Sequence, residues 1–231
     1  MKWGLEPPFK TSYHLNTINA RVEHVSESKL YGRLLDSKRC VVVVDGFYEW
    51  SHINKERVPY LIRFDDATPE ESILSAFPTT QSTQSSTQPS HATNNRESSD
   101  TDCILPEGVS PLFLAGLYDV SSESGSYSCT ILTTDSCGKV GNIHERMPVL
   151  LSPSTARDWL DCDSKFSTII PSVLDSSKKL ANRLICIQVS PLVNSVANKS
   201  KEVTLPIAEH KKRSLEKGLG RFFSTKKPKL L

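Results

Sequence analysis

Two short segments of this 231-residue chain combine residue types that move protons and hold anions. In the first, Glu49 stands among the aromatic residues of the run Phe47-Tyr48-Glu49-Trp50. In the second, His144 lies two residues before Arg146. A carboxyl group held against apolar rings is desolvated, which raises its pKa toward the range useful for proton transfer. Histidine titrates near neutral pH, and arginine binds phosphates through a fork of N–H donors. The segments therefore predict an acid–base pair, Glu49 and His144, beside an anion clamp, Arg146.

Each of these residues also has a purely structural interpretation. Glu49 could be a carboxylate at the rim of a strand, and His144 could be a capping or core histidine. Cys137 lies seven residues before His144 and is a candidate nucleophile. Seven loop residues do not fix a thiolate–imidazole geometry, so an inert thiol is the favoured interpretation of Cys137.

The elements that must position these residues are mainly strands. The β-branched run 39–44 predicts a strand buried on both faces, ending just before the aromatic segment. Further strands are expected at 59–64, 112–118, 127–133 and 184–189, with a hairpin turn between 52 and 57. A short helix is expected at 26–35, and a second helix begins at 152–155. The pattern predicts a strand-dominated α+β single domain without a Gly-rich phosphate loop.

Composition indicates that part of the chain lies outside the folded core. Between Thr79 and Ser90, eleven of twelve residues are Ser, Thr or Gln, too few apolar groups to offset the entropy of ordering. Because strands resume afterwards, we expect a disordered insert at about 66–110 inside one domain of residues 1–205. Residues 206–231 are expected to form a flexible basic tail.

Charge and cysteine usage narrow the function classes. From Glu209 onward there are eight Lys and Arg against two Glu, a net of +6, which leaves −4 for the rest of the chain. A nucleic-acid site in the body must therefore be a local basic patch. The six cysteines include no C-x-x-C pair, so reduced thiols in an intracellular protein are expected, with no metal and no cofactor. No apolar run serves as a signal peptide or a membrane span, so no membrane partner is expected.

An ordered series of blocks carries a resemblance to a known family. The blocks, in chain order, are Trp3-Gly4-Leu5, Asn19-Ala20-Arg21-Val22-Glu23, Arg39-Cys40, Asp45 to Trp50, Pro59-Tyr60, Ala115-Gly116-Leu117-Tyr118, Thr130 to Thr134 and Ile143 to Pro148. In this order they resemble the SOS-response-associated peptidase family, and within it the abasic-site processing proteins of eukaryotes. The resemblance covers roughly residues 1–200 apart from the insert, and it implies a partly open barrel with flanking helices.

The resemblance implies chemistry on single-stranded DNA that carries abasic sites. In the family, a cysteine at the mature N-terminus closes to a thiazolidine with the ring-opened sugar, and it also drives self-release and propeptide removal. This sequence has Lys2 at that position, and the opening segment of the family domain is expected to be absent. Two interpretations stay open: the abasic-site crosslinking of the family, with its lyase and peptidase activities, or a non-catalytic remnant that binds single-stranded DNA or the replication sliding clamp.

Matched positions carry roles over from the family. Asn19 would orient the N-terminal amine and the sugar, Glu49 would sense the abasic site and shuttle a proton, and His144 would assist opening of the deoxyribose ring. Three arginines, Arg21, Arg39 and Arg146, would bind phosphates, and Trp50 would pack against the DNA or support Glu49. Arginines along a groove with aromatic platforms are what single-stranded DNA binding requires.

The tail holds a second motif. Leu219, Phe222 and Phe223, followed by the basic run 226–229, resemble a peptide that docks on the replication sliding clamp, although Glu216 replaces the usual leading glutamine. The alternative is a disordered basic tail of nuclear-localisation character. We expect a protein of the nucleus, located on chromatin at replication forks.

Overall fold

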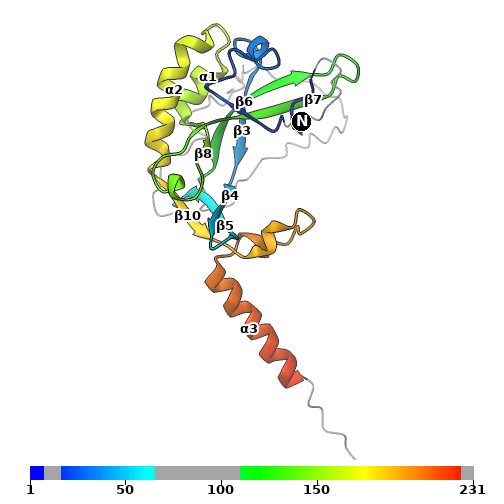
Figure 1. Ribbon diagram of the computed structural model, residues 1–231. Coiled ribbons are helices and arrows are strands. Elements are labelled where there is room, and N and C mark those ends of the chain that lie inside the picture. The colour runs from blue at the N-terminus through cyan, green and yellow to red at the C-terminus, as the bar shows by residue number, and fades with distance from the viewer. Residues whose placement is uncertain (8–16, 66–109, 225–231) are drawn as a thin grey trace, which may run out of the picture.

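The computed structural model describes residues 1–7, 17–65 and 110–224, and side chains as far as residue 216 (Figure 1). The strands are β1 Lys2–Trp3, β2 Asn19–Arg21, β3 Arg39–Val44, β4 Phe47–Ile53, β5 Glu56–Phe64, β6 Leu112–Val120, β7 Tyr127–Asp135, β8 Arg146–Pro148, β9 Leu150–Leu151 and β10 Leu184–Gln188. The helices are α1 Pro153–Leu160, α2 Phe166–Ala181 and α3 Ile207–Ser224, and short 3-10 turns include η1 Gly32–Leu34, η3 Val140–Asn142 and η4 Pro191–Asn194.

The larger sheet is built around β7. Its order is β1-β7-β6-β3, and β2 and β8 also pair with β7 while β9 pairs with β6. The short strands β1 and β2 run parallel to β7, and the other pairs are antiparallel. In this register Asn19 lies opposite Ile131, and Arg21 lies opposite Thr133. Residues near the start of the chain therefore reach the middle of the sheet.

The smaller sheet has the order β10-β5-β4 and is antiparallel. β4 and β5 form a hairpin whose turn residues, Asn54 and Lys55, have φ angles of 50° and 70°. Two successive residues with positive φ are typical of a tight hairpin turn that matches the twist of its strands. Side chains alternate along β4, so Glu49 faces the larger sheet and Trp50 the other side.

Two apolar cores lie on opposite faces of the larger sheet. Ala115 and Leu117 point toward α1 and α2, where Trp159 is fully buried. These helices cover one side of the sheet in Figure 1. Leu112 and Leu114, one residue out of phase, point toward the smaller sheet. The alternation of β6 thus divides its apolar residues between a helix-covered core and a sheet-covered core.

A buried ion cluster lies at the far end of β6. Asp119 accepts hydrogen bonds from Arg33 and from Lys38, the latter at 2.6 Å. Burial alone would raise the pKa of the Asp119 carboxyl, but the hydrogen bonds and charges of the two cations outweigh it and lower the pKa to about 2. This cluster joins η1 and Lys38, the residue before β3, to β6.

Most of the predicted elements are confirmed. The strand-dominated α+β class is correct, with mixed sheets and no closed barrel among the described strands. The predicted helix start is correct, since Ser152 and Thr155 form a reciprocal capping box at α1. Within 26–35 the short helix that was expected is limited to η1, a 3-10 helix of three residues.

Three further features differ from expectation. β3 pairs only with β6 among the described strands, and Val43 on it is 53% exposed, so it is not buried on both faces. The helix α2 was not predicted. Residues 207–224 form α3, which extends away from the body in Figure 1, and no helix was predicted there. The expected insert at about 66–110 lies outside the described residues except for its last position.

Two other observations bear on function class. The five cysteines in the described part of the chain are free thiols. None of the helices described has the length and apolar content needed to cross a bilayer.

Candidate functional site

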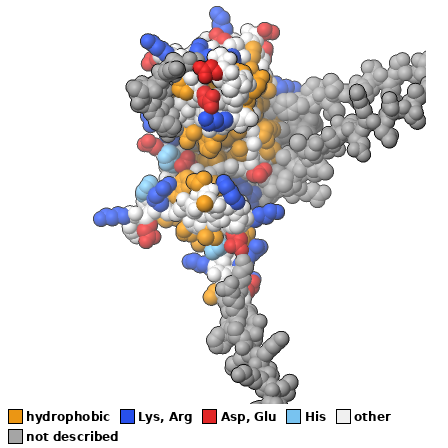
Figure 2. Space-filling model, turned by 90° about the vertical axis from the view of Figure 1, so that its right-hand side faces the viewer, with side chains coloured by type: hydrophobic (Ala, Val, Ile, Leu, Met, Phe, Trp, Pro, Cys, Tyr) orange, Lys and Arg blue, Asp and Glu red, His pale blue; other side chains and the backbone are white. Residues whose placement is uncertain are grey.

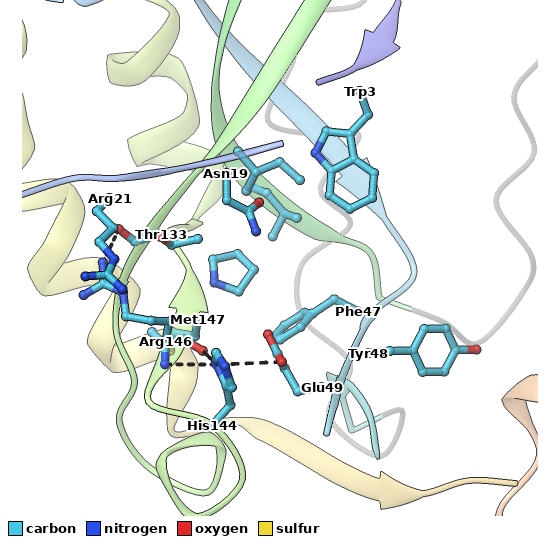
Figure 3. A pocket seen from close by; sticks show the side chains of 13 residues that line it. Trp3, Asn19, Arg21, Phe47, Tyr48, Glu49, Thr133, His144, Arg146 and Met147 are labelled. Atoms are coloured by element: carbon cyan, nitrogen blue, oxygen red, sulfur yellow. Dashed lines mark hydrogen bonds and ion pairs between the residues drawn. The ribbon is translucent and has the colours of Figure 1, made fainter. Parts of the chain in front are cut away.

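A pocket of about 320 Å³ lies where the smaller sheet meets the larger one (Figure 3). Its floor is apolar, and its polar side chains come from four separate parts of the sequence: β2, β4, β7 and the segment around β8. The lining residues are Trp3, Asn19, Arg21, Phe47, Tyr48, Glu49, Leu114, Ile131, Thr133, His144, Arg146, Met147 and Pro148.

The predicted acid–base pair is brought together in this pocket. His144 Nδ1 lies 3.7 Å from Glu49 Oε2. The same nitrogen is 3.0 Å from the Arg146 carbonyl oxygen and 3.2 Å from the Arg146 backbone N–H. A ring nitrogen either donates or accepts, so Nδ1 accepts from the Arg146 N–H in one tautomer and donates to an oxygen in the other or in the imidazolium. The backbone of Arg146 therefore holds the His144 ring in either tautomer.

Burial raises the pKa of the Glu49 carboxyl, and the charge of His144 partly offsets that rise. Phe47 precedes Glu49 on the same face of β4 and also lines the pocket, which accounts for part of this desolvation. A carboxyl group whose pKa is raised toward neutrality takes up and releases protons more readily at physiological pH.

Arg146 is held by carboxylates on both sides. Its Nη2 donates to Glu23 Oε2 at 2.8 Å and to the Thr133 carbonyl at 2.8 Å, while Nη1 contacts Glu23 and Asp135. Burial would lower the pKa of the guanidinium, but Glu23 and Asp135 raise it. The side chain is 13% exposed, and its Nε is buried without a hydrogen-bond partner. A phosphate that binds Arg146 must therefore compete with two carboxylates.

Arg21 is the less encumbered cation of the pocket. It and Asn19 flank the buried Ala20 on β2, so both point to the same side and into the pocket (Figure 3). The Arg21 guanidinium makes no ion pair or hydrogen bond with any residue in the described ranges. Both residues line the same pocket as Glu49 and His144.

Arg39 requires a correction, because the structure places it far from this pocket and inside the helix-covered core. The residue is 3% exposed, and its guanidinium donates to four backbone carbonyls. These carbonyls belong to Leu35, Trp159, Asp161 and Ser164. Its charge also lies 5.6 Å from the Trp159 ring centroid. Arg39 is therefore a structural residue that caps the end of α1, with four of its five N–H donors bonded to backbone carbonyls inside the fold.

Trp50 lies outside the pocket lining, on the opposite face of β4 from Glu49. Its indole N–H donates to Asn194 Oδ1 at 2.7 Å, and the Arg57 guanidinium lies 4.9 Å from its ring centroid. Trp50 therefore joins β4 to η4, and a contact with DNA there stays a prediction.

Sequence reasoning did not name three aromatic residues of the pocket, Trp3, Phe47 and Tyr48, as site residues. Trp3 is 57% exposed, and its indole N–H donates to the Ile18 carbonyl at 2.8 Å, which fixes the ring at the pocket mouth. Phe47 and Tyr48 also line the pocket. The i, i+2 spacing of Phe47 and Glu49 on a strand was the signal that could have identified Phe47.

Two other candidates lie elsewhere. Cys137 does not line the pocket, and its Sγ lies 3.9 Å from the Lys178 carbonyl oxygen. The clamp-motif residues Leu219, Phe222 and Phe223 lie within α3. Their side chains are outside the described part of the chain. No group of His, Cys, Asp or Glu side chains in the described part of the chain is placed to hold a metal ion.

Comparison with known proteins identifies the family of the chain. The family model described as SOS response associated peptidase (SRAP) matches residues 1–196. The chain belongs to the SOS response associated peptidase family. That match includes every residue that lines the pocket.

Curated relatives of this SOS response associated peptidase chain share one kind of name. The abasic site processing protein YoaM of Bacillus subtilis is 31% identical over 211 residues, which cover 88% of this chain and 73% of YoaM. The abasic site processing protein HMCES of Xenopus tropicalis is 35% identical over 174 residues, 70% of this chain and 44% of HMCES. A crystal structure of a protein from Bacteroides thetaiotaomicron matches with a TM-score of 0.59 at 19% identity, over 88% of this chain and 74% of that one. This last likeness concerns the fold.

Proposed function

We propose that this chain binds single-stranded DNA at abasic sites and holds the opened sugar beside Glu49 and His144. The observation that carries the proposal is the 3.7 Å approach of these two side chains inside a pocket that also contains Asn19 and Arg21. Relatives named abasic site processing proteins supply the substrate class.

The pocket provides what opening of an abasic sugar requires. The ring form is a hemiacetal, and opening it removes a proton from the anomeric hydroxyl and returns one to the ring oxygen. Glu49, whose pKa is raised by burial, accepts the first proton, and the His144 imidazolium donates the second. Arg21 holds the phosphate beside the lesion, and the Asn19 amide hydrogen-bonds the sugar. The product is an aldehyde that lies beside Glu49 and His144.

The covalent step of the family needs a thiol and an amine. No cysteine lies among the described residues that line the pocket, so the roles proposed for this chain's residues are binding and proton transfer. The second candidate, a non-catalytic remnant, is favoured by that same observation. Clamp binding by the tail and a nuclear location remain separate proposals, based on the sequence of residues 216–229.

The test compares three single-stranded oligonucleotides: one with an abasic site, one with a ring-closed tetrahydrofuran analogue, and one intact. We expect tighter binding of the abasic strand than of the intact strand. Arg21→Gln should weaken binding of all three by about tenfold, the value of one charge-assisted contact. Glu49→Gln and His144→Gln should reduce the rate at which an aldehyde-reactive probe labels the bound abasic strand.

The matched control is His52→Gln, an exposed histidine on the same hairpin outside the pocket. Equal binding of the abasic and intact strands would refute the proposal. A covalent band on a denaturing gel that disappears in Glu49→Gln would show that the chain as given also forms the crosslink. Binding without any effect of Glu49 or His144 on labelling would favour the non-catalytic remnant.

A further inference from the structure

The body and the C-terminal helix carry opposite net charge. Residues 209–231 contribute +6 to a chain whose total is +2. In α3, Lys211 and Lys212 are both exposed. Neither has an ion-pair partner within the described ranges, in contrast to Arg213, which pairs with Glu209 at 2.6 Å. The helix thus presents cations that the rest of the described fold does not neutralise.

The base of α3 is joined to the elements next to the pocket. Val189, after β10, forms a bridge with Pro206, just before α3. Ser190 and Pro191 share a surface groove with Ile207, Lys211 and Leu215. The neighbouring residue of η4, Asn194, accepts the indole N–H of Trp50. Lys211 therefore lies in a groove beside η4, and η4 contacts the strand that carries Glu49.

A line of cations and rings connects these elements. Tyr48 lines the pocket, and Trp50, on the same face of β4, carries Arg57 over its ring at 4.9 Å. Figure 2 shows Lys and Arg side chains gathered around the lower part of the molecule, above the point where α3 leaves it. Aromatic rings alternating with cations are the surface that a single strand requires, since bases stack on the rings and phosphates meet the cations.

We infer that α3 is a second DNA-binding element, which holds the phosphate backbone of the single strand beyond the pocket. This inference rests on the proposed function. The ten residues of α3 whose side chains are described, 207–216, extend about 15 Å from the body and carry Lys211 and Lys212. Its contribution is electrostatic and independent of sequence, so it sets how strongly affinity falls with salt, whereas the pocket sets the preference for the lesion.

The decisive measurement is the salt dependence of affinity for strands of two lengths. The full chain is titrated by fluorescence anisotropy with a 6-nucleotide and a 30-nucleotide strand, each intact or abasic, over a range of NaCl concentrations. Each cation that neutralises a phosphate of single-stranded DNA contributes about −0.7 to the slope of log K against log [salt]. Lys211→Gln with Lys212→Gln should therefore make the slope shallower by about 1.4 for the 30-mer and leave the 6-mer unchanged.

Lys178→Gln with Lys179→Gln is the matched control, because it removes two exposed lysines from α2 on the opposite side of the larger sheet. An unchanged 30-mer slope in the α3 variant, or an equal change in the control, would overturn the inference. So would loss of binding to phosphatidylserine vesicles with the DNA slope intact, since the helix would then serve a membrane surface.

The same titration separates this inference from the proposed function. If the 30-mer slope depends on α3 but abasic and intact strands bind equally, the helix binds DNA and the proposed pocket function fails. If the abasic preference is present but the slope ignores α3, the pocket function stands and the inference about α3 fails.

Discussion

Replacing Arg39 tests whether this arginine stabilises the fold or binds DNA. Its guanidinium donates to two carbonyls at fully buried positions, Trp159 and Leu35, and to two at partly buried ones. Arg39→Met keeps the apolar stem and removes every donor. A buried acceptor left unpaired costs about 1–3 kcal/mol, and water replaces donors only at the partly buried sites. Two unpaired buried carbonyls and the lost contact with the Trp159 ring give a destabilisation of about 3–5 kcal/mol.

Urea unfolding followed by tryptophan fluorescence measures this effect. For an m-value of about 2 kcal/mol/M, a loss of this size lowers the unfolding midpoint by about 1.5–2.5 M. The control is Arg21→Met, an exposed arginine in the pocket, which should change the free energy of unfolding by less than about 0.5 kcal/mol but weaken DNA binding. The opposite result, a stable Arg39→Met protein with impaired DNA binding, would refute this reasoning and restore the phosphate role of Arg39.

Three further predictions concern carboxyl groups. The pKa of Glu49 is raised in the folded state, so its ionisation opposes folding above that pKa. Glu49→Gln should therefore be more stable than the wild type at pH 7, and thermal unfolding should show the gain shrinking as pH falls toward 4.5 and absent below that pH. Asp119 has a pKa lowered from 3.8 to about 2, so the stability it contributes is present above pH 4 and is lost as pH falls to 2. Asp119→Asn should cost about 2 kcal/mol at pH 7 and almost nothing at pH 2 in chemical denaturation; a pH-independent cost would contradict this assignment. Asp135→Asn removes one of the carboxylates that compete for Arg146, and anisotropy should show single-stranded DNA binding about two- to fivefold more tightly with a steeper salt slope. Unchanged binding in that variant would mean that Arg146 does not meet the backbone.

Residues of the pocket were easier to single out from the sequence than the long-range contacts that hold the surrounding fold together. Glu49 and His144 were singled out from short local motifs and Asn19 from the family resemblance, and the structure brings the three into one pocket. Arg39 was misassigned because its partners are backbone carbonyls 120 to 125 residues away, apart from Leu35, and no pattern in the sequence records them. The pairing of Glu23 with Arg146 was missed for the same reason, since the two residues lie 123 positions apart along the chain.

Helices were the weaker part of the prediction. The capping box at Ser152 identified α1 because its residues are adjacent in sequence. α2 was missed although its apolar residues, such as Ile169 and Val173, lie at helical spacing. It contains an internal proline, Pro171, and its N-cap residue, Lys165, makes no side-chain capping bond, so the usual start signal is missing.

Glu49 lies on β4 of the smaller sheet, and His144 lies just before β8 of the larger sheet. The distance between them therefore changes when one sheet moves relative to the other. No hydrogen-bonded ladder joins the two sheets in the described strands; side chains such as Ile62, Leu114 and Met147 fill the space between them. Sliding of one layer over the other would alter the Glu49–His144 gap without breaking any strand pairing. The distance between Glu49 and His144 therefore depends on how the two sheets are placed relative to each other. Bound DNA under tension would change proton transfer in the pocket by moving one sheet, without contacting Glu49 or His144.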